Sequence, residues 1–462
     1  MEADWETVKI KAKDNNIKPV YHAFYYILHI YRQAVGLKGR RIVLNNKHNF
    51  NRFLLLWAGE LVSSIGGGLT SFGLGVYVFQ QTGSAADMAL VTFLAFLPTL
   101  LLSVPAGVLA DRYDRRLLMM LGDGCSAVGV LFILFCILNG GASLTEICIG
   151  VTVSSVFSSL LEPSYRATVT DLLDAEEYSR ASGMVSLAGS ARYLISPVLA
   201  GALLTVSSIR LLLILDICTF FLTVICTGIV RKGLAAKTAE KKEPFFAALQ
   251  MGWQAVTEKR GVFLLILLSS VMTCFMGAFQ ILAEPLILDF ADSATLGIGE
   301  TICASGMLVS GLFLGARGIK KGYLKVLSVS LTVAGIAMVI FGLKENIYLI
   351  CAAGFLFFAM LPFANNCLDF LVRTNIADEL QGRAWGFIGF LSQIGYVAAY
   401  GFAGILADRI GEQFQVGVGR GAAAVIMASG VLLGIMALAV YPIKGVRELE
   451  NGMSKAGERS AS

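Results

Sequence analysis

The sequence GVLADRYDRR, from Gly107 to Arg116, forms a short polar turn between two long apolar stretches. Its last six positions hold two aspartates and three arginines. An apolar stretch of about 20 residues is long enough to cross the hydrocarbon core of a bilayer, so the turn is expected at a membrane surface. Its arginines favour the cytoplasmic side, where the short loops of membrane proteins are enriched in Lys and Arg.

The whole chain has the composition of a membrane protein. Of its 462 residues, 56% are hydrophobic and 15% are charged, whereas about 25% of residues are charged in soluble domains. Its mean hydropathy is +0.72. Twelve apolar spans follow one another at residues 53–79, 88–110, 117–138, 145–165, 181–205, 211–230, 261–288, 297–316, 323–342, 346–372, 384–407 and 420–442. We therefore predict an all-α membrane protein with twelve transmembrane helices.

The basic residues predict the orientation of these spans. With the N-terminus in the cytoplasm, 32 of the 37 Lys and Arg residues fall on the cytoplasmic side. The exceptions are Arg210, Lys344, Arg409 and Arg420 in external loops and Arg192 within a span. Both termini are therefore predicted to be cytoplasmic. The net charge of +5 then follows from topology, and no nucleic-acid partner is expected.

An internal duplication is indicated by charges that recur after 207 residues. The matched residues are Glu162, Arg166 and Asp171 in the first half and Asp369, Arg373 and Asp378 in the second. Each set lies at the cytoplasmic end of the fourth span of its half, which favours duplication over coincidence. The predicted units are a cytoplasmic N-terminal extension (1–52), a first six-helix half (53–230), a cytoplasmic linker (231–260), a second six-helix half (261–442) and a cytoplasmic tail (443–462).

The N-terminal extension contains KPVYHAFYYILHIYRQA at residues 18–34, which mixes aromatic and basic side chains. This pattern is compatible with an amphipathic helix that lies along the membrane interface, and a poorly ordered extension is the alternative. No apolar core followed by a small-residue cleavage site precedes the first span, so no cleavable signal peptide is expected.

The turn resembles the loop between the second and third helices of the major facilitator superfamily of secondary transporters. The pattern Gly-x-x-x-Asp-Arg-x-x-Arg-Arg falls on Gly107, Asp111, Arg112, Arg115 and Arg116. Asp114 stands where the family usually has glycine. The resemblance implies two pseudo-symmetric six-helix halves with a substrate site between them near the membrane midplane. A second copy of the motif's start, GILADR at 404–409, ends the eleventh span and is expected to face outward without the basic tail.

Two further segments resemble bacterial exporters grouped with macrolide-efflux and siderophore-export proteins. They are RATVTDLLDAEEYSRASGM, from Arg166, and RTNIADELQGRAWGF, from Arg373. The likeness extends from Phe53 to Tyr441. It implies the fold and an export-like function more strongly than it implies a substrate.

The resemblance also implies a gate at the cytoplasmic side. Asp111 would lie near the N-terminus of the eleventh span, where free backbone amides favour an anion. The arginines of the turn would pair with Glu162 and Asp171, and these contacts would break when the cytoplasmic side opens. The predicted gating residues are Gly107, Asp111, Arg112, Arg115, Arg116, Glu162, Arg166, Asp171, Asp369 and Arg373. The alternative is that they only anchor topology and bind anionic lipid.

Three of the charged residues within the spans of the first half, Glu60, Asp216 and Arg192, are candidates for coupling or for the substrate cavity. Glu60 lies beside a stripe of small residues in the first span, and an ionisable group at that depth is costly and marks function by default. Asp216 and Arg192 either line the cavity or form a structural pair. Because no histidine lies within a span, Glu60 is the leading candidate for a proton carrier and Asp216 the second. Glu284 and Asp289, near the outer end of the seventh span, are expected on a solvated face.

The fifth span contains SPVLAG at residues 196–201, which resembles a Gly-Pro-x-x-Gly-Gly element of antiporters. Pro197 removes a backbone hydrogen bond and is expected to bend the helix where the halves rock. A kink with only a structural role is the alternative.

Motifs for enzymes, ATP-driven pumps and metal sites do not occur in the sequence. It has no Gly-Lys dipeptide, HExxH or GxSxG, and its nine cysteines have no CxxC spacing. No cofactor, metal or enzymatic activity is therefore expected. The resemblance implies a proton-coupled exporter of amphipathic small molecules such as drugs, conferring antibiotic resistance from a bacterial cytoplasmic membrane. Its expected partners are that substrate, a proton or other coupling ion, and membrane lipids.

The same fold leaves other functions open. An uptake carrier or a lysophospholipid flippase is the nearest alternative. A membrane sensor or assembly factor that does not transport belongs to a different class, and the intramembrane charges argue against it.

Overall fold

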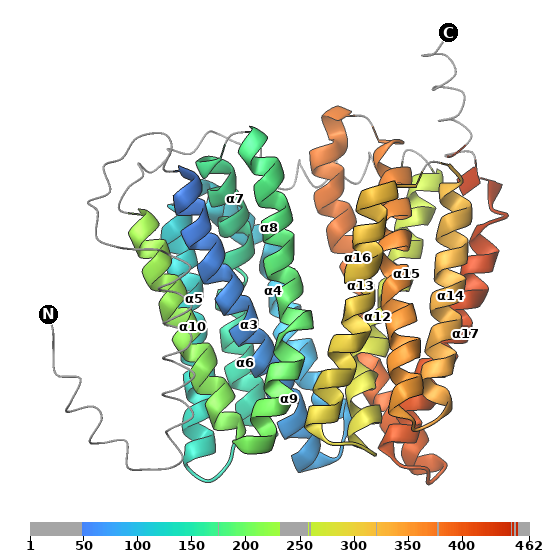
Figure 1. Ribbon diagram of the computed structural model, residues 1–462, viewed down its shortest axis with the longest axis horizontal. Helices are drawn as coiled ribbons and strands as arrows, with labels where there is room; N and C mark the ends of the chain where they lie inside the picture. Colours follow the sequence, from blue (N-terminus) through green and yellow to red (C-terminus); the bar gives the residue numbers. More distant parts are fainter. Residues whose placement is uncertain are drawn as a thin grey trace, which may run out of the picture.

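The computed structural model describes residues 49–173, 175–231, 260–319, 321–376 and 378–444, together with Thr257, Val446, Arg447 and Glu450. The segment 18–34 and nearly all of the expected linker and tail lie outside these residues. The described part of the chain is helical and contains no strand. Its helices form two groups that stand side by side (Figure 1).

The first group consists of α3 (Asn49–Thr82), α4 (Ala85–Arg112), α5 (Arg115–Leu138), α6 and α7 (Leu144–Ser158 and Leu161–Leu172), α8 and α9 (Ala175–Leu194 and Ser196–Val206) and α10 (Ile209–Arg231). The second consists of α12 (Arg260–Leu288), α13 (Ser293–Arg317), α14 (Tyr323–Leu343), α15 (Ile347–Arg373), α16 (Asp378–Gln413) and α17 (Val418–Val440). Twelve of the described helical segments are long and apolar enough to cross a membrane. The predicted twelve-helix architecture is confirmed.

Polar residues in the turns begin several of these helices. The Ser84 side chain caps α4, and Asp292 caps α13 in the same way. Ser143 and Glu146 form a reciprocal capping box at the start of α6. Such caps satisfy backbone N–H groups that have no partner within the helix, so the short polar turns fix where each span begins.

Aromatic packing fills the second half. The ring of Phe279 in α12 stacks on Phe357 at a centroid distance of 4.2 Å and meets Phe341 edge-on at 4.6 Å. The same apolar core continues into the first half through Phe72 and Leu212, so the two halves share one core where they touch.

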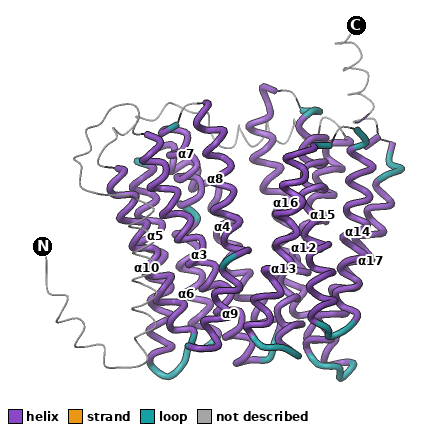
Figure 2. The backbone as a smooth tube through the Cα atoms, viewed as in Figure 1, coloured by secondary structure: helices purple, strands orange, loops and turns teal. Residues whose placement is uncertain are grey.

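The two halves meet at only one end of the described bundle. We call the end that carries the turn from Asp111 to Arg116 the basic end, and the opposite end the Asp408 end. Toward the basic end, which is uppermost in Figures 1 and 2, the two groups of helices diverge. At the Asp408 end α4 packs on α16 and α9 packs on α13.

The contact between α9 and α13 depends on glycine. A Cβ atom at Gly201 would lie 2.5 Å from the Ser293 carbonyl oxygen, and one at Gly297 would overlap the Pro197 carbonyl group. A larger residue at either position would force the backbones apart. Small residues allow helices in lipid to approach this closely.

Candidate functional site

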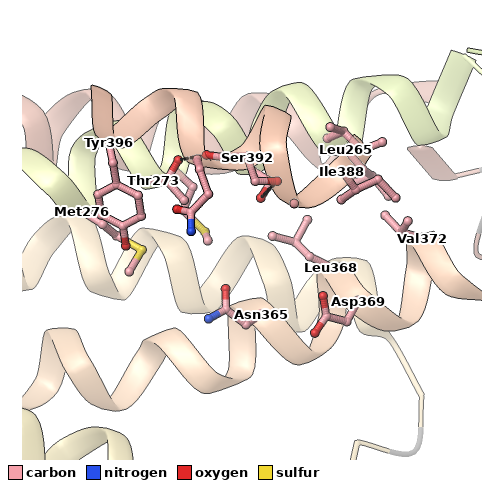
Figure 3. A pocket seen from close by; sticks show the side chains of 15 residues that line it. Leu265, Thr273, Met276, Asn365, Leu368, Asp369, Val372, Ile388, Ser392 and Tyr396 are labelled. Carbon is pink, nitrogen blue, oxygen red and sulfur yellow. Dashed lines mark hydrogen bonds between the residues drawn. The ribbon is translucent and has the colours of Figure 1, made fainter. Parts of the chain in front are cut away.

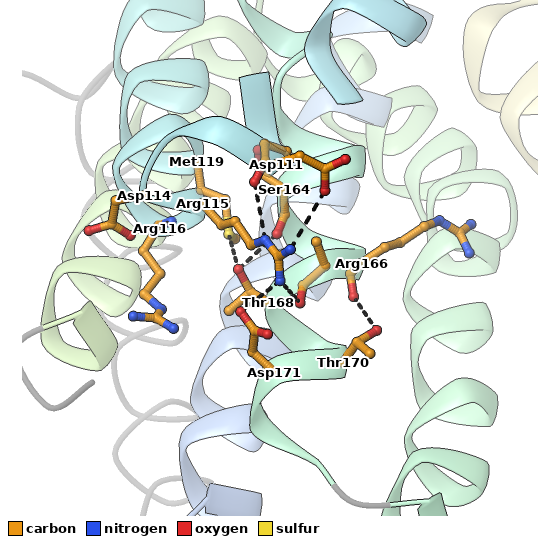
Figure 4. A network of polar contacts seen from close by, with 12 residues as sticks. Asp111, Asp114, Arg115, Arg116, Met119, Ser164, Arg166, Thr168, Thr170 and Asp171 are labelled. Atoms are coloured by element: carbon orange, nitrogen blue, oxygen red, sulfur yellow. Dashed lines mark hydrogen bonds and ion pairs between the residues drawn. The ribbon is translucent and has the colours of Figure 1, made fainter. Parts of the chain in front are cut away.

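The turn between α4 and α5 is held by Arg115, the first residue of α5 (Figure 4). Its guanidinium lies 2.7 Å from the Asp171 carboxylate of α7 and 3.7 Å from Asp111 at the end of α4. It also donates hydrogen bonds to the carbonyl oxygens of Ala110 and Ala167, at 3.1 and 3.0 Å. Arg115 thus ties the ends of three helices of the first half together.

Asp114, in the same turn, binds the start of α5 and the end of α10. Its Oδ1 accepts a hydrogen bond from the backbone N–H of Arg116 at 3.1 Å, and its Oδ2 lies 2.7 Å from Arg231 Nε. Burial raises the pKa of Asp114, but the hydrogen bonds from Arg231 and Arg116 and their charges outweigh this effect. The pKa of Asp114 therefore lies below its ordinary value.

The remaining predicted residues of the turn differ in their surroundings. Arg112 is exposed, whereas Arg116 is buried and its Nε has no hydrogen-bond partner among the described residues. A Cβ atom at Gly107 would meet no atom within 4 Å, so no close contact requires a glycine there.

Asp408, near the end of α16, connects the halves at the Asp408 end. Its carboxylate accepts hydrogen bonds from Ser84 Oγ at 2.7 Å and from the N–H groups of Ala85 and Ala86 at 2.9 and 3.0 Å. These donors form the start of α4, where free N–H groups and the helix dipole both favour an anion. One carboxylate of the second half therefore caps a helix of the first.

A cavity of about 320 Å³ lies in the second half between α12, α15 and α16 (Figure 3). Its lining mixes apolar and polar side chains: Leu265, Ile266, Ser269, Met272, Thr273, Met276, Asn365, Leu368, Asp369, Val372, Ile388, Gly389, Ser392, Gln393 and Tyr396. Asp369 supplies the carboxylate of this lining and lies on α15 one turn from Asn365 (Figure 3). A mostly apolar cavity with a few polar groups is the usual form of a small-molecule site.

Aromatic side chains border this cavity where the halves meet. Tyr396 lines the cavity, and Tyr400 lies one turn further along α16. The ring of Phe96 in α4 packs against both of them, at centroid distances of 5.8 and 5.5 Å. Tyr400 also donates a hydrogen bond to Gln280 of α12 at 3.2 Å. Both halves therefore contribute rings to this border.

Two predicted carboxylates lie inside the first half. Asp216 on α10 is 1% exposed, and its Oδ1 accepts a hydrogen bond of 3.4 Å from Thr219. Thr70 of α3 faces the same carboxylate, although its buried hydroxyl does not reach hydrogen-bond geometry. Glu60 lies on α3 at a partly exposed position. Arg192, on α8, is exposed, and its charge acts on Asp216 from a distance.

The sequence of this two-group helical bundle matches a known family. The sequence profile of the Major Facilitator Superfamily matches residues 56–400. The chain belongs to this superfamily. As a member, the protein is a transporter rather than an enzyme, and it crosses the membrane several times.

Relatives in the superfamily include efflux proteins. Macrolide efflux protein A of Streptococcus pyogenes is 24% identical over 406 residues, which cover 86% of this chain and 97% of that protein. The multidrug efflux pump Tap of Mycobacterium bovis is 22% identical over 370 residues, which cover 77% of this chain and 86% of the pump.

Solved structures of the superfamily share the fold. The nucleoside transporter NupG superimposes with a TM-score of 0.65 at 14% identity, over 85% of this chain and 100% of that one. A bacterial homologue of the iron transporter ferroportin, in an inward-facing state, gives a TM-score of 0.64 at 14% identity, over 85% and 99% of the two chains.

The structure brings together only part of the gating set expected for this superfamily. Arg115 and Asp171 form an ion pair, whereas Glu162 lies 2.9 Å from Arg166 one turn away on α7, with both side chains exposed. Asp369 lines the cavity, and its role in the gate stays a prediction. The side chains of Arg373 and of 377–387 at the start of α16 lie outside the described residues, so a contact of Asp111 with that helix stays a prediction.

Pro197 lies just beyond a break in the fifth span. The helix is interrupted at Ile195, between α8 and α9. At this break the Leu194 carbonyl oxygen accepts a hydrogen bond from Thr301 of the second half at 3.0 Å, and Ser196 donates to the Ile65 carbonyl oxygen at 3.0 Å. The residues at this interruption are therefore hydrogen-bonded to both halves.

Several functional candidates were missed by the sequence analysis. Asp123 in α5 is an intramembrane carboxylate, and the tripeptide Gly-Asp-Gly in an apolar span was its available signal. Asp408 lies in the second copy of the motif, which the sequence analysis gave no role. Within the described residues, no cluster of three His, Cys, Asp or Glu side chains is placed to hold a metal ion.

The expectation that Glu284 lies on a solvated face is wrong. Its Oε2 is buried and has no hydrogen-bond partner among the described residues, and it would lie 2.7 Å from a Cβ atom at Gly75 of α3. The charge of Glu300 in α13 acts on it. The reason is that α12 turns this position toward the other half, whereas Asp289, five residues later, is exposed as expected.

Proposed function

We propose that this protein exports amphipathic small molecules, of the macrolide or drug class, by proton antiport across a bacterial cytoplasmic membrane. The observation that carries the proposal is the buried carboxylate of Asp216, with Glu60 on α3 of the same half, together with the amphipathic cavity in the second half. Burial disfavours the charged form of a carboxylate, so such groups bind and release protons as their access to water changes. The efflux names of the relatives support the direction.

Alternating access would use the two ends of the α4 and α16 pair. In the present state Asp408 caps α4 and joins the halves at the Asp408 end. In the opposite state Asp111 would cap the start of α16, and the Arg115 network would hold the basic end closed. Substrate and protons would bias this equilibrium by binding the two states with different affinities.

The basic end would face the cytoplasm, because that orientation leaves few basic residues outside. Reporter domains inserted within residues 233–243 and after Ser462 are expected to report a cytoplasmic location. A reporter near Gly140, in the turn between α5 and α6, should be external. An external signal from the 233–243 fusion would reverse the proposed direction of transport.

The transport proposal is tested in proteoliposomes with erythromycin as the probe. The purified protein is expected to move erythromycin against its gradient when a pH gradient is imposed. Glu60→Gln and Asp216→Asn should abolish this uphill transport and retain downhill exchange. Undiminished uphill transport by both variants would point to another ion. Uptake instead of export, movement of lysophospholipid alone, or no movement at all would favour the respective alternative functions.

A further inference from the structure

The third carboxylate of the first half, Asp123, is almost fully buried. It is 1% exposed, and its Oδ2 has no hydrogen-bond partner among the described residues. A buried charged group without a partner costs several kcal/mol, so a carboxylate in this position is expected to hold a proton or to exchange one.

Close helix contacts place Asp123 and Glu60 at the same level of the bundle. A Cβ atom at Gly124, next to Asp123, would lie 4.0 Å from Val224 of α10. A Cβ atom at Gly59, next to Glu60, would lie 3.4 Å from Cys226, which is two residues further along the same helix. Both carboxylates therefore lie beside one turn of α10.

Asp216 lies further toward the Asp408 end. A Cβ atom at Gly66 would lie 2.8 Å from Asp216 Oδ1, seven residues along α3 from Gly59. Seven residues correspond to about 10 Å along a helix. The order of the carboxylates along the bundle is therefore Asp216, then Asp123 and Glu60, then the basic end.

The charges that face Asp123 are those of its two neighbours in this series. Glu60 from α3 and Asp216 from α10 act on it, and both are acidic. Negative charges on Glu60 and Asp216 disfavour ionisation of Asp123, so the protonation states of these carboxylates depend on one another. The buried hydroxyl groups of Tyr165 and Thr227 also have no hydrogen-bond partner among the described residues.

We propose that Asp123 is the bridging carrier of a proton path that runs from Asp216 through Asp123 to Glu60 within the first half. When the Asp408 end opens, Asp216 binds a proton from the external side. In each following step the O–H bond of one carboxylic acid breaks, directly or through water, and a new O–H bond forms on the next carboxylate. The donor becomes a carboxylate and no electrons are transferred. Glu60 then releases the proton toward the basic end.

This inference rests on the proposed proton antiport and adds a residue to it. The test compares wild type, Asp123→Asn and Asp123→Glu in proteoliposomes, with Ser126→Ala as a matched control that alters a buried polar side chain of the same helix. A pH-sensitive dye inside the vesicles measures the proton flux stimulated by erythromycin. Downhill erythromycin exchange is measured without a pH gradient.

Asp123→Asn is expected to lower the proton flux on the order of 100-fold, as expected for loss of a proton-transfer group. Downhill exchange should stay within about twofold of wild type, since a carrier of protons alone is not needed for it. Asp123→Glu should restore most of the flux, and Ser126→Ala should leave it unchanged. Wild-type flux in Asp123→Asn would overturn the role of Asp123 and leave proton antiport intact, whereas absence of flux in the wild type would overturn both.

If Asp123→Asn does not insert in the membrane, infrared spectroscopy of the wild type and of Asp123→Glu tests whether Asp123 binds and releases a proton. The C=O stretch of a protonated carboxylic acid should appear and disappear with pH, and its position should change in Asp123→Glu. A pH-dependent band that is identical in both proteins would overturn the proposal.

Discussion

Two copies of nearly the same hexapeptide end the antiparallel helices α4 and α16, and they make different contacts. GILADR, at 404–409, places Asp408 on the start of α4 in the other half. GVLADR, at 107–112, places Asp111 at 3.7 Å from Arg115 in its own half. Within the residues that the structure describes, Asp408 thus joins the two halves, whereas the Arg115 guanidinium beside Asp111 belongs to the same half as Asp111.

The residues that follow each copy explain the difference. After Arg409 the helix α16 continues to Gln413. After Arg112 the helix α4 ends, and Arg115 and Arg116 begin α5. Only GVLADR, at 107–112, is therefore followed by basic residues that attract its aspartate. The contrast therefore lies in the neighbours of each aspartate: backbone N–H groups of the other half for Asp408, and an arginine of its own half for Asp111.

The largest effect is expected for Asp408→Asn. The neutral amide cannot accept three hydrogen bonds as strongly as the carboxylate, and hydrogen bonds to charged groups contribute about 1.5–3 kcal/mol. The population closed at the Asp408 end should fall by about 10- to 100-fold relative to the opposite state. Distances between spin labels at Gln81→Cys and Glu412→Cys, measured in a background without reactive cysteines, would report this. Unchanged distance distributions would show that the hydrogen bonds of Asp408 do not hold the two halves together at this end.

Asp111→Asn is expected to impair transport by about tenfold, since it removes an attraction of about 1 kcal/mol to the α16 N-terminus and to the neighbouring arginines. Arg112→Lys keeps the positive charge at an exposed position and should have a smaller effect. Erythromycin export is the measurement, with membrane abundance as the control. Normal export by Asp111→Asn would reduce the turn to a marker of topology.

Asp171→Asn tests whether the basic end depends on contacts within its own half. The variant weakens an ion pair of 2.7 Å in which the Asp171 side chain is 11% exposed. We expect a loss of about 1–2 kcal/mol of stability, because Arg115 keeps its two carbonyl partners. Thermal unfolding in detergent is the measurement, and Asp111→Asn is the matched control because its distance to Arg115 is longer. Equal melting temperatures for Asp171→Asn and wild type would contradict this role.

The smallest effect concerns pH and Asp114. Because its pKa is lowered in the folded protein, Asp114 contributes stability that is present at neutral pH and is lost as pH falls through that lowered pKa. Arg231 is 42% exposed, so screening by water limits the contribution to about 1 kcal/mol or less. Asp114→Asn should lower stability slightly at neutral pH and flatten its decline toward acid pH. A decline as steep as that of the wild type would exclude Asp114 as its cause.

The sequence was sufficient for the twelve spans because lipid imposes a hydropathy pattern on every helix that crosses it. The resemblance to the superfamily also gave Glu162 and Asp171 as candidate partners for the arginines of the turn, and of these two Asp171 pairs with Arg115. The buried positions of Asp123 and Glu284 could not be predicted from the sequence. Whether a carboxylate in an apolar helix faces water, lipid or another helix depends on the rotation of that helix, which hydropathy does not fix.

Asp369 illustrates the same limit. The internal repeat relates it to Glu162, and the structure places it in the lining of a cavity that also includes Ser269, Thr273 and Ser392. The cavity depends on side chains from three helices far apart in the sequence. Which side chains meet in this cavity is decided by how the three helices pack, and the sequence pattern of each helix alone does not show it.

The glycine contact between α9 and α13 has a consequence for the rate of exchange between states. Backbones that meet at Gly201 and Gly297 interpose no side chains there, so separation at these points requires no change of rotamer. Separation of α9 from α13 at this contact therefore adds little to the activation barrier. The activation barrier for opening the Asp408 end is then expected to arise from the hydrogen bonds between the halves, which include those of Asp408 and the one from Thr301 to the Leu194 carbonyl oxygen. The glycine contact lets α9 and α13 return to each other quickly once those bonds can form again.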